Sequence, residues 1–262
     1  MSDKKAPVNC TKHGESYATF VCQHLARGFG LGFFCAEDPQ DPQPDGWCAA
    51  CNQILDKEGG WNDRSEKFAG ITLVCAHCYD MIKQRNLLQS DFDLQKGFTC
   101  PSCGKYHEET PMDMGFEAPA YYYSIPKNQR KKRCSLTPDL CIVDDEFFFI
   151  RGCLEVPVWG IPRPFVWGVW TSLSQQNYKR TLAIWNKKKR IKEPPYFGWL
   201  SSLLPPSLYP DTIQLKTMVH TRGLKERPLV ILEPTDHPLA VDQREGMPLE
   251  RLKTIVESIL HL

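Results

Sequence analysis

The sequence predicts an α+β protein in two parts: a small N-terminal zinc module of treble-clef or ribbon type, then a mainly antiparallel sheet domain with a few helices. Close pairs of Cys and His residues crowd the first part, and the chain of 262 residues is long enough for two domains. The second part has aromatic and β-branched runs broken by Gly and Pro, without regular βαβ alternation. We expect the zinc module within residues 1–90 and the sheet domain within 97–262.

Four ligand pairs with short internal gaps predict the zinc module. These pairs are Cys10 with His13, Cys22 with His24, Cys48 with Cys51, and Cys75 with Cys78. A structural zinc ion takes four thiolate or imidazole ligands, and one tight turn can present two of them, so four pairs predict two zinc ions. The two CxxC pairs are expected to share one ion and the two Cys/His pairs the other. A cross-braced arrangement, first pair with third and second with fourth, stays open.

The expected compartment supports metal ligands over disulfides. The first ten residues are polar, and the chain has neither a signal-peptide-like segment nor a run of about 18 apolar residues. We therefore expect a cytoplasmic protein without membrane association, whose twelve cysteines stay reduced. The stretch VCAHCYDMIKQ has the local pattern of a thioredoxin-like redox motif, but a second CxxC pair favours a shared metal.

A further knuckle, FTCPSCGKYH, opens the second domain at residues 98–107. The candidate ligands of a third zinc ion are Cys100, Cys103, His107 and either Cys134 or Cys141. The alternative is that these thiols are buried in an ordinary core, which is also the simplest interpretation of Cys153.

Hydrophobic patterns predict the remaining elements. Strands are expected within 145–160, 164–174 and 227–234, and helices within 78–88, 174–187 and from Pro248 onward. The buried face of the middle helix should carry Tyr178, Leu182 and Trp185. That of the last helix should carry Leu249, Leu252, Ile255, Val256 and Ile259. Residues 193–210 are interrupted by prolines and should wrap the surface, and the glycine-rich residues 28–33 should form a loop.

Catalytic patterns are weak in this sequence. It contains no GxSxG elbow, HExxH helix or phosphate-binding loop. Two acidic clusters remain as candidates for metal binding or acid–base chemistry: Asp144, Asp145 and Glu146 ahead of Arg151, and Glu233 and Asp236 beside His237. Both also suit polar turns, which is the interpretation we favour.

Two basic runs are the only pattern typical of nucleic-acid binding. They cover residues 128–133 and 186–192, but the formal net charge of the chain is only +1. A phosphate-binding surface usually carries a strong positive bias, so we expect these runs to be solvated loops.

The second part also resembles a known family. The stretches CPSCGKYH, LTPDLCIVDDEFFFIRGCLEVPV, FVWGVWTSLS, YFGWL, RPLVILEPTDHPLA and QREGMPLER, in this order, are similar to the bacterial family called domain of unknown function 2199. The resemblance covers about residues 98–262, with the family's opening knuckle at Cys100, Cys103 and His107. It implies a bacterial, cytosolic domain with no catalytic residues to transfer. The four-pair module then looks like an added N-terminal domain.

These observations favour a zinc-stabilised, non-catalytic protein that binds another protein, as a regulator or a toxin-immunity protein. Its abundant Trp, Tyr and Phe residues suit an interface. One alternative is a nucleic-acid-associated zinc-finger regulator that uses Lys187, Lys188 and Lys189. Another is a metal-assisted hydrolase or transferase centred on Glu233, Asp236 and His237, which needs an open metal position. The patterns do not set the oligomeric state.

Overall fold

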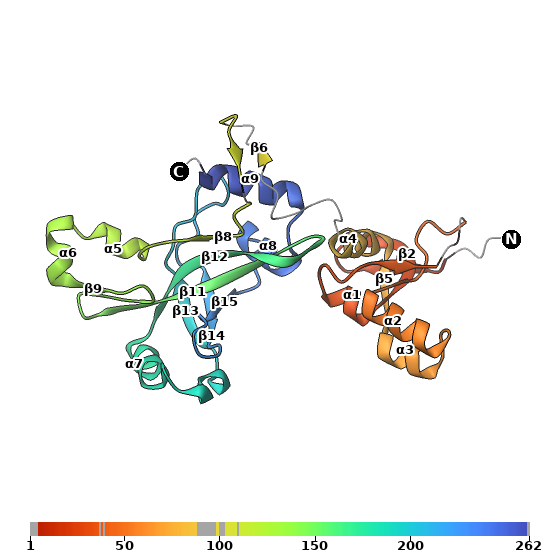
Figure 1. The fold of residues 1–262 in the computed structure, drawn as a ribbon, viewed down its shortest axis with the longest axis horizontal. Helices are drawn as coiled ribbons and strands as arrows, with labels where there is room; N and C mark the ends of the chain where they lie inside the picture. The colour runs from red at the N-terminus through yellow and green to blue at the C-terminus, as the bar shows by residue number, and fades with distance from the viewer. Residues whose placement is uncertain are drawn as a thin grey trace. The chain divides into compact units, whose positions relative to one another are not determined.

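The computed structural model describes residues 5–36, 38, 40–87, 98–99, 103–108 and 110–260 (Figure 1). The chain divides into two compact units: Met1–Asp93 with Val158–Arg163, and Leu94–Pro157 with Pro164–Leu262. Each mixes helices with sheets, so the α+β class predicted from the sequence is confirmed. The domain boundaries of 90 and 97 stay a prediction, and residues 88–97 lie outside the described residues.

Unit 1 is a small mixed sheet with short helices attached. Its strands are β1 (Pro7–Cys10), β2 (Gly14–Cys22), β3 (Phe34–Cys35), β4 (Gly46–Trp47) and β5 (Ile71–Cys75). Its helices are α1 (Gln23–Arg27), α2 (Ala49–Glu58), α3 (Asp63–Ala69) and α4 (Ala76–Asn86). The central strand is β2, which pairs antiparallel with β1 and β5 and parallel with β4. Helix α4 confirms the helix expected at 78–88, and residues 28–33 form the expected loop.

Cysteines occupy the residue that precedes three of these helices. Cys22, Cys48 and Cys75 are the N-caps of α1, α2 and α4, each with extended backbone. The thiol of Cys22 accepts the Leu25 N–H at 3.4 Å, and the thiol of Cys75 accepts the Cys78 N–H at the same distance. Residues that precede a helix usually satisfy its free N–H groups with side-chain oxygens, so sulfur at these positions suggests a second role for the thiols.

Unit 2 is built on a larger sheet whose strands are short except for one long hairpin. Its strands are β8 (Asp113–Gly115), β9 (Cys134–Leu136), β10 (Leu140–Val143), β11 (Phe147–Val158), β12 (Ile161–Leu173), β13 (Tyr196–Leu200), β14 (Lys216–His220) and β15 (Leu229–Leu232), except that the tip of the β11 and β12 hairpin, Val158–Arg163, belongs to unit 1. A separate pair joins β6 (Phe98–Thr99) to β7 (Tyr106–His107). The helical elements are α5 (Ala120–Ser124), α6 (Lys127–Arg133), α7 (Gln175–Ile184), the 3-10 helix η1 (Lys188–Lys192), α8 (Pro238–Glu245) and α9 (Leu249–Leu260).

The large sheet closes on itself. Strands β11, β12, β13, β14 and β15 pair in sequence, and β15 returns to β11 through a parallel contact at Cys153 and Leu229. The hairpin of β11 and β12 turns at Trp159 and Gly160, where Gly160 has φ 75°. Most pairings are antiparallel, as predicted; the parallel ones are β8 with β12 and β11 with β15. Closure leaves few free strand edges, which protects the sheet from pairing with other chains.

Alternation along the hairpin fills the core of unit 2. In β12 the side chains of Phe165, Trp167 and Val169 are fully buried while the residues between them are only partly so. In β11, Leu154 and Val156 are likewise fully buried, and the residues next to them are only partly buried. A strand presents successive side chains to opposite faces, so this period-two pattern produces one buried face. The strands expected at 145–160, 164–174 and 227–234 are therefore confirmed.

Two helical predictions differ in outcome. The last helix is confirmed as α9, with Leu249, Leu252, Ile255 and Val256 buried and Ile259 partly exposed. In α7 the buried residues are Tyr178, Thr181 and Ile184, while Leu182 is 47% exposed. The expected face was therefore wrong at Leu182. The tyrosine anchors α7 by packing against residues of β11, β12, β13 and β14, and this rotates the helix so that positions three apart from it face inward.

Three segments expected at the surface or in loops form regular structure instead. Residues 193–210 contain β13, which lies between β12 and β14, and then place Leu204 and Tyr209 in the core. Their prolines flank the strand, where no ladder hydrogen bond is lost. The basic runs form α6 and η1 rather than loops. In η1 the Arg190 side chain is buried over the Trp185 ring, at 5.1 Å from its centroid.

A buried acidic group joins α8 to α9. Asp242 accepts hydrogen bonds from the Tyr209 hydroxyl at 2.8 Å and from Arg251 Nε at 2.6 Å, and the Arg251 guanidinium lies over the Tyr209 ring. We expect Asp242→Asn to lower the free energy of unfolding of unit 2 by about 1–2 kcal/mol, because the shape is kept but the charge facing Arg251 is lost. Urea unfolding with hydrogen exchange in α9 measures this.

The control for this change is Glu250→Gln on the same helix, where the side chain is 80% exposed. It should leave the urea midpoint unchanged. Equal midpoints for the Asp242 and Glu250 variants would contradict a stabilising role for the buried carboxylate.

Candidate metal centres

The ligand pairs of unit 1 come together in two groups of four. One group joins Cys10 and His13 to Cys75 and Cys78, and the other joins Cys22 and His24 to Cys48 and Cys51. In each group the candidate ligand atoms all lie within 4.8 Å of one another. Each group is therefore a Cys3His set that could hold a metal ion.

The distances fit a tetrahedral ion. His13 Nδ1 lies 3.7, 3.5 and 3.4 Å from the sulfurs of Cys10, Cys75 and Cys78, and His24 Nδ1 lies 3.3 Å from Cys51 Sγ. Bond lengths of about 2.3 Å to sulfur and about 2.1 Å to nitrogen would separate the ligands of a tetrahedron by about 3.6 Å. The side chains are thus spaced as ligands of one central atom.

This grouping corrects the pairing expected from the sequence. The two CxxC pairs do not share a group, and the cross-braced alternative is not formed either: the first pair joins the fourth, and the second joins the third. The reason lies in β2, which separates the first two pairs by the length of its nine residues, about 26 Å at the usual rise per residue. One ion cannot bridge that distance.

Strand register then selects the partners. Strand β5 runs antiparallel to β2 with Cys75 opposite Ala18, so its last residue and the following turn lie toward the start of β2. Strand β4 runs parallel to β2 with Gly46 opposite Val21, which carries Cys48 to the end of β2. Pairing across the sheet therefore brings together residues that are far apart in the chain.

The electrostatics of both groups suit a bound cation. Hydrogen bonds from the backbone of Lys12 and His13 lower the pKa of Cys10 to about 6. Burial, followed by hydrogen bonding and repulsion from Cys75, raises the pKa of Cys78 to about 12. Burial, followed by repulsion from Cys22, likewise raises the pKa of Cys51. Several thiolates can coexist at such short distances only if a positive ion lies among them.

The two groups differ in burial. Cys22, Cys48 and Cys51 belong to the hydrophobic core of unit 1, which also contains Leu25 and Tyr79. In the other group only Cys75 is buried. Loss of an ion from the buried group should therefore disturb the core more than loss from the exposed one.

Comparison with known proteins concerns unit 2. A model of the family described as "Uncharacterized protein conserved in bacteria (DUF2199)" matches residues 99–247, more than half of the chain. The chain belongs to this family. The DUF2199 region begins at β6 and ends before α9, so it includes none of the eight residues of the two Cys3His groups. No curated protein and no solved structure matches the chain.

The knuckle at the start of the DUF2199 region is described in part. Cys103 Sγ lies 3.6 Å from His107 Nε2, on either side of the turn before β7, while Cys100 lies outside the described residues. Cys141 is completely buried in a different place, packed with Ile125, Val143, Phe149 and Trp170. It forms no metal group with Cys103 and His107.

The other thiols of the region differ in their surroundings. Cys134 packs against the cluster that contains Cys141. Cys153 lies in β11 but is only partly buried, so the expectation of a core residue was wrong there, because its side chain is on the less buried face of the strand. Burial raises the pKa of Cys134 and of Cys153, and it raises that of Cys141 to about 12. These thiols are therefore held neutral at pH 7, which is typical of structural cysteines.

The acidic clusters of the DUF2199 region do not converge on a catalytic centre among the described residues. Asp144 binds Arg133 through two hydrogen bonds of 2.6 Å, in the polar turn that precedes β11. Glu233 pairs with Lys216 at 3.2 Å, and His237 caps α8 by accepting the Leu239 N–H at Nδ1. The described residues place neither cluster in a group that could hold a metal.

Helix length and composition bear on membranes. Within the described ranges, no helix combines the length and apolarity that crossing a bilayer requires.

Proposed function

We propose that this chain is a zinc-stabilised, non-catalytic protein of the bacterial cytosol that acts by binding another protein. The observation that carries the proposal is the closed composition of the two Cys3His groups. Each supplies four protein ligands, which fill the tetrahedral shell of zinc and leave no position for water or substrate. A set of three sulfurs and one imidazole binds zinc in preference to magnesium or calcium, which favour oxygen ligands. Reduced thiols of this kind are typical of the cytosol.

An exposed apolar row supports the binding role. Phe197, Met218 and Ile231 lie opposite one another across β13, β14 and β15, and they are 46%, 38% and 39% exposed. Trp199, also exposed, contacts the Phe197 ring edge to face at 5.1 Å. Contiguous apolar side chains on a surface commonly mark protein interfaces. Within the class of protein-binding proteins, we propose that it is a regulator or a toxin-immunity protein.

Affinity capture from the native host tests this function. The full chain, the variant Met218→Glu and the control Lys179→Glu on the exposed face of α7 would be compared with and without nuclease. We expect one stoichiometric protein to survive nuclease treatment, to be kept by the control and to be reduced at least about tenfold by the Met218 variant, since a buried unpaired charge is costly in an interface. Recovery of nucleic acid in place of a protein would contradict the proposal and favour the nucleic-acid-associated alternative.

A further inference from the structure

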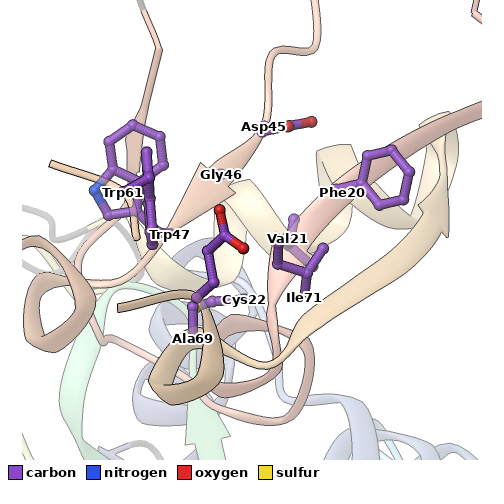
Figure 2. A pocket seen from close by; sticks show the side chains of 10 residues that line it. Phe20, Val21, Cys22, Asp45, Gly46, Trp47, Trp61, Ala69 and Ile71 are labelled. Atoms are coloured by element: carbon purple, nitrogen blue, oxygen red, sulfur yellow. The ribbon is translucent and has the colours of Figure 1, made fainter. Parts of the chain in front are cut away.

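A hollow of about 210 Å³ lies in unit 1 beside the buried Cys3His group. Figure 2 shows its lining: Trp47 and Trp61 stand on one side, and Phe20 and Ile71 stand on the other. Glu66 of α3 also lines the hollow. The space is large enough for one long side chain. Its walls come from β2, β4, β5, α3 and the segments that carry Asp45 and Trp61, so every wall belongs to unit 1.

The aromatic wall is held in a fixed orientation. The Trp47 and Trp61 rings meet edge to face, with centroids 5.4 Å apart and planes at 85°. Trp47 Nε1 donates a hydrogen bond of 3.0 Å to Asn52 Oδ1, which fixes the indole, while Trp61 remains 41% exposed. An indole face attracts a cation more strongly than any other side-chain ring.

The rim of the hollow is acidic. Glu66 and Asp45 both line it, and within the described ranges of the chain neither carboxylate forms an ion pair with a Lys or Arg side chain. Burial raises the pKa of Asp45, with a smaller opposing effect of Lys5, so that ionising this group costs free energy. A cation that binds in the hollow would offset this free-energy cost by stabilising the ionised carboxylate.

An apolar wall with an acidic rim selects a particular kind of ligand. A purely apolar ligand would strip water from two carboxylates without replacing it. A small inorganic cation would leave the indoles, Phe20 and Ile71 without a contact. Arginine and lysine side chains match both surfaces, because they carry a charge at the end of an apolar stem.

We propose that this hollow binds the side chain of an arginine or lysine from a basic segment of a partner protein. The stem lies against Trp61 and Ile71, and the charged group meets Glu66 and Asp45. This inference rests on the proposed function, in that the occupant is a protein, and it adds the chemistry of the segment that is bound. Cys22 lines the same hollow and belongs to the buried Cys3His group, so the walls keep their positions only while that group is intact.

Peptide titration of the purified, metal-loaded full chain tests the inference. The probes are a blocked pentapeptide with a central arginine and the same peptide with citrulline, a neutral analogue of equal shape, and the readout is the NMR shift of the Trp47 indole N–H, which every variant below retains. We expect the arginine peptide to bind, with an affinity that falls as salt is added, and the citrulline peptide to bind at least about tenfold more weakly.

Variants locate the binding. Glu66→Gln should lower the affinity for the arginine peptide at least about fivefold, and Trp61→Ala should lower it by a similar factor. Glu250→Gln in unit 2 is the control for the change in net charge. Each variant must keep two metal ions and the wild-type thermal midpoint; where Glu66→Gln does not, Asp45→Asn replaces it. Equal binding of the two peptides, or unchanged affinity in folded Glu66 and Trp61 variants, overturns the inference. Absence of peptide binding alongside a captured host protein would overturn the inference while leaving the proposed function in place.

Discussion

Cys51→Ser is expected to remove the metal ion held by its own group and to destabilise unit 1 strongly. Cys51 is 1% exposed, its Sγ lies 3.3 Å from His24 Nδ1, and it belongs to the core cluster of this unit. Structural zinc contributes on the order of 10–16 kcal/mol in small modules, so loss of a buried ligand should lower the free energy of unfolding by more than about 4 kcal/mol. Metal analysis of the purified protein, with hydrogen exchange in α2 and α4, measures both effects.

A cysteine outside the groups provides the control. Cys35 lies in β3 of the same unit, is partly buried, and belongs to neither group. Cys35→Ser should therefore retain two ions, while Cys75→Ser should lose the other ion and leave unit 2 folded. Two ions and unchanged stability in the Cys51 variant would show that the ligand assignment is wrong.

The second large effect is expected at Trp170 in unit 2. Its side chain is completely buried, packs with Ile125, Cys141 and Phe149, and donates a hydrogen bond of 2.8 Å from Nε1 to the Phe116 carbonyl. Trp170→Ala removes this packing and leaves the Phe116 carbonyl without its donor. We expect the free energy of unfolding to fall by about 3–5 kcal/mol, as measured by urea unfolding of unit 2.

Trp199→Ala is the matched control for that change. Trp199 lies in β13 of the same sheet but is 41% exposed. Its loss should cost clearly less than the loss of Trp170, because much of the Trp199 side chain already lies in solvent. If both tryptophan variants lost the same stability, burial at Trp170 would not be the cause.

Local patterns were enough to predict much of this structure. The gaps within each ligand pair identified all eight residues of the two Cys3His groups, because a knuckle depends on a few neighbouring residues. The apolar spacing in α9 and the alternation in the β11 and β12 hairpin were informative for the same reason.

What the sequence did not predict depends on contacts between distant segments. The grouping of pairs follows from the register of β2 with β4 and β5, which no local gap encodes. The inward face of α7 follows from what Tyr178 packs against, and β13 is an interior strand because its neighbours need a partner. The hollow was missed because Trp47, Trp61 and Glu66 come together only after α2 and α3 fold back. The local sequence pattern that hinted at the hollow was GWC, in which an aromatic residue stands beside a ligand cysteine.

The order of the ligand groups along the chain has a consequence for assembly. The pairs are nested like brackets: the inner group is complete once residue 51 has been synthesised, whereas the outer group must wait for Cys78. Loop-closure entropy changes only slowly with loop length, so the lengths of the two loops do not decide which ion binds first. The order is set by which ligands are synthesised first and by how deeply each group is buried. We therefore expect the ion of the inner group to bind first during synthesis and to be the last that a chelator removes. The ion of the outer group would bind later, to a unit whose centre is already folded.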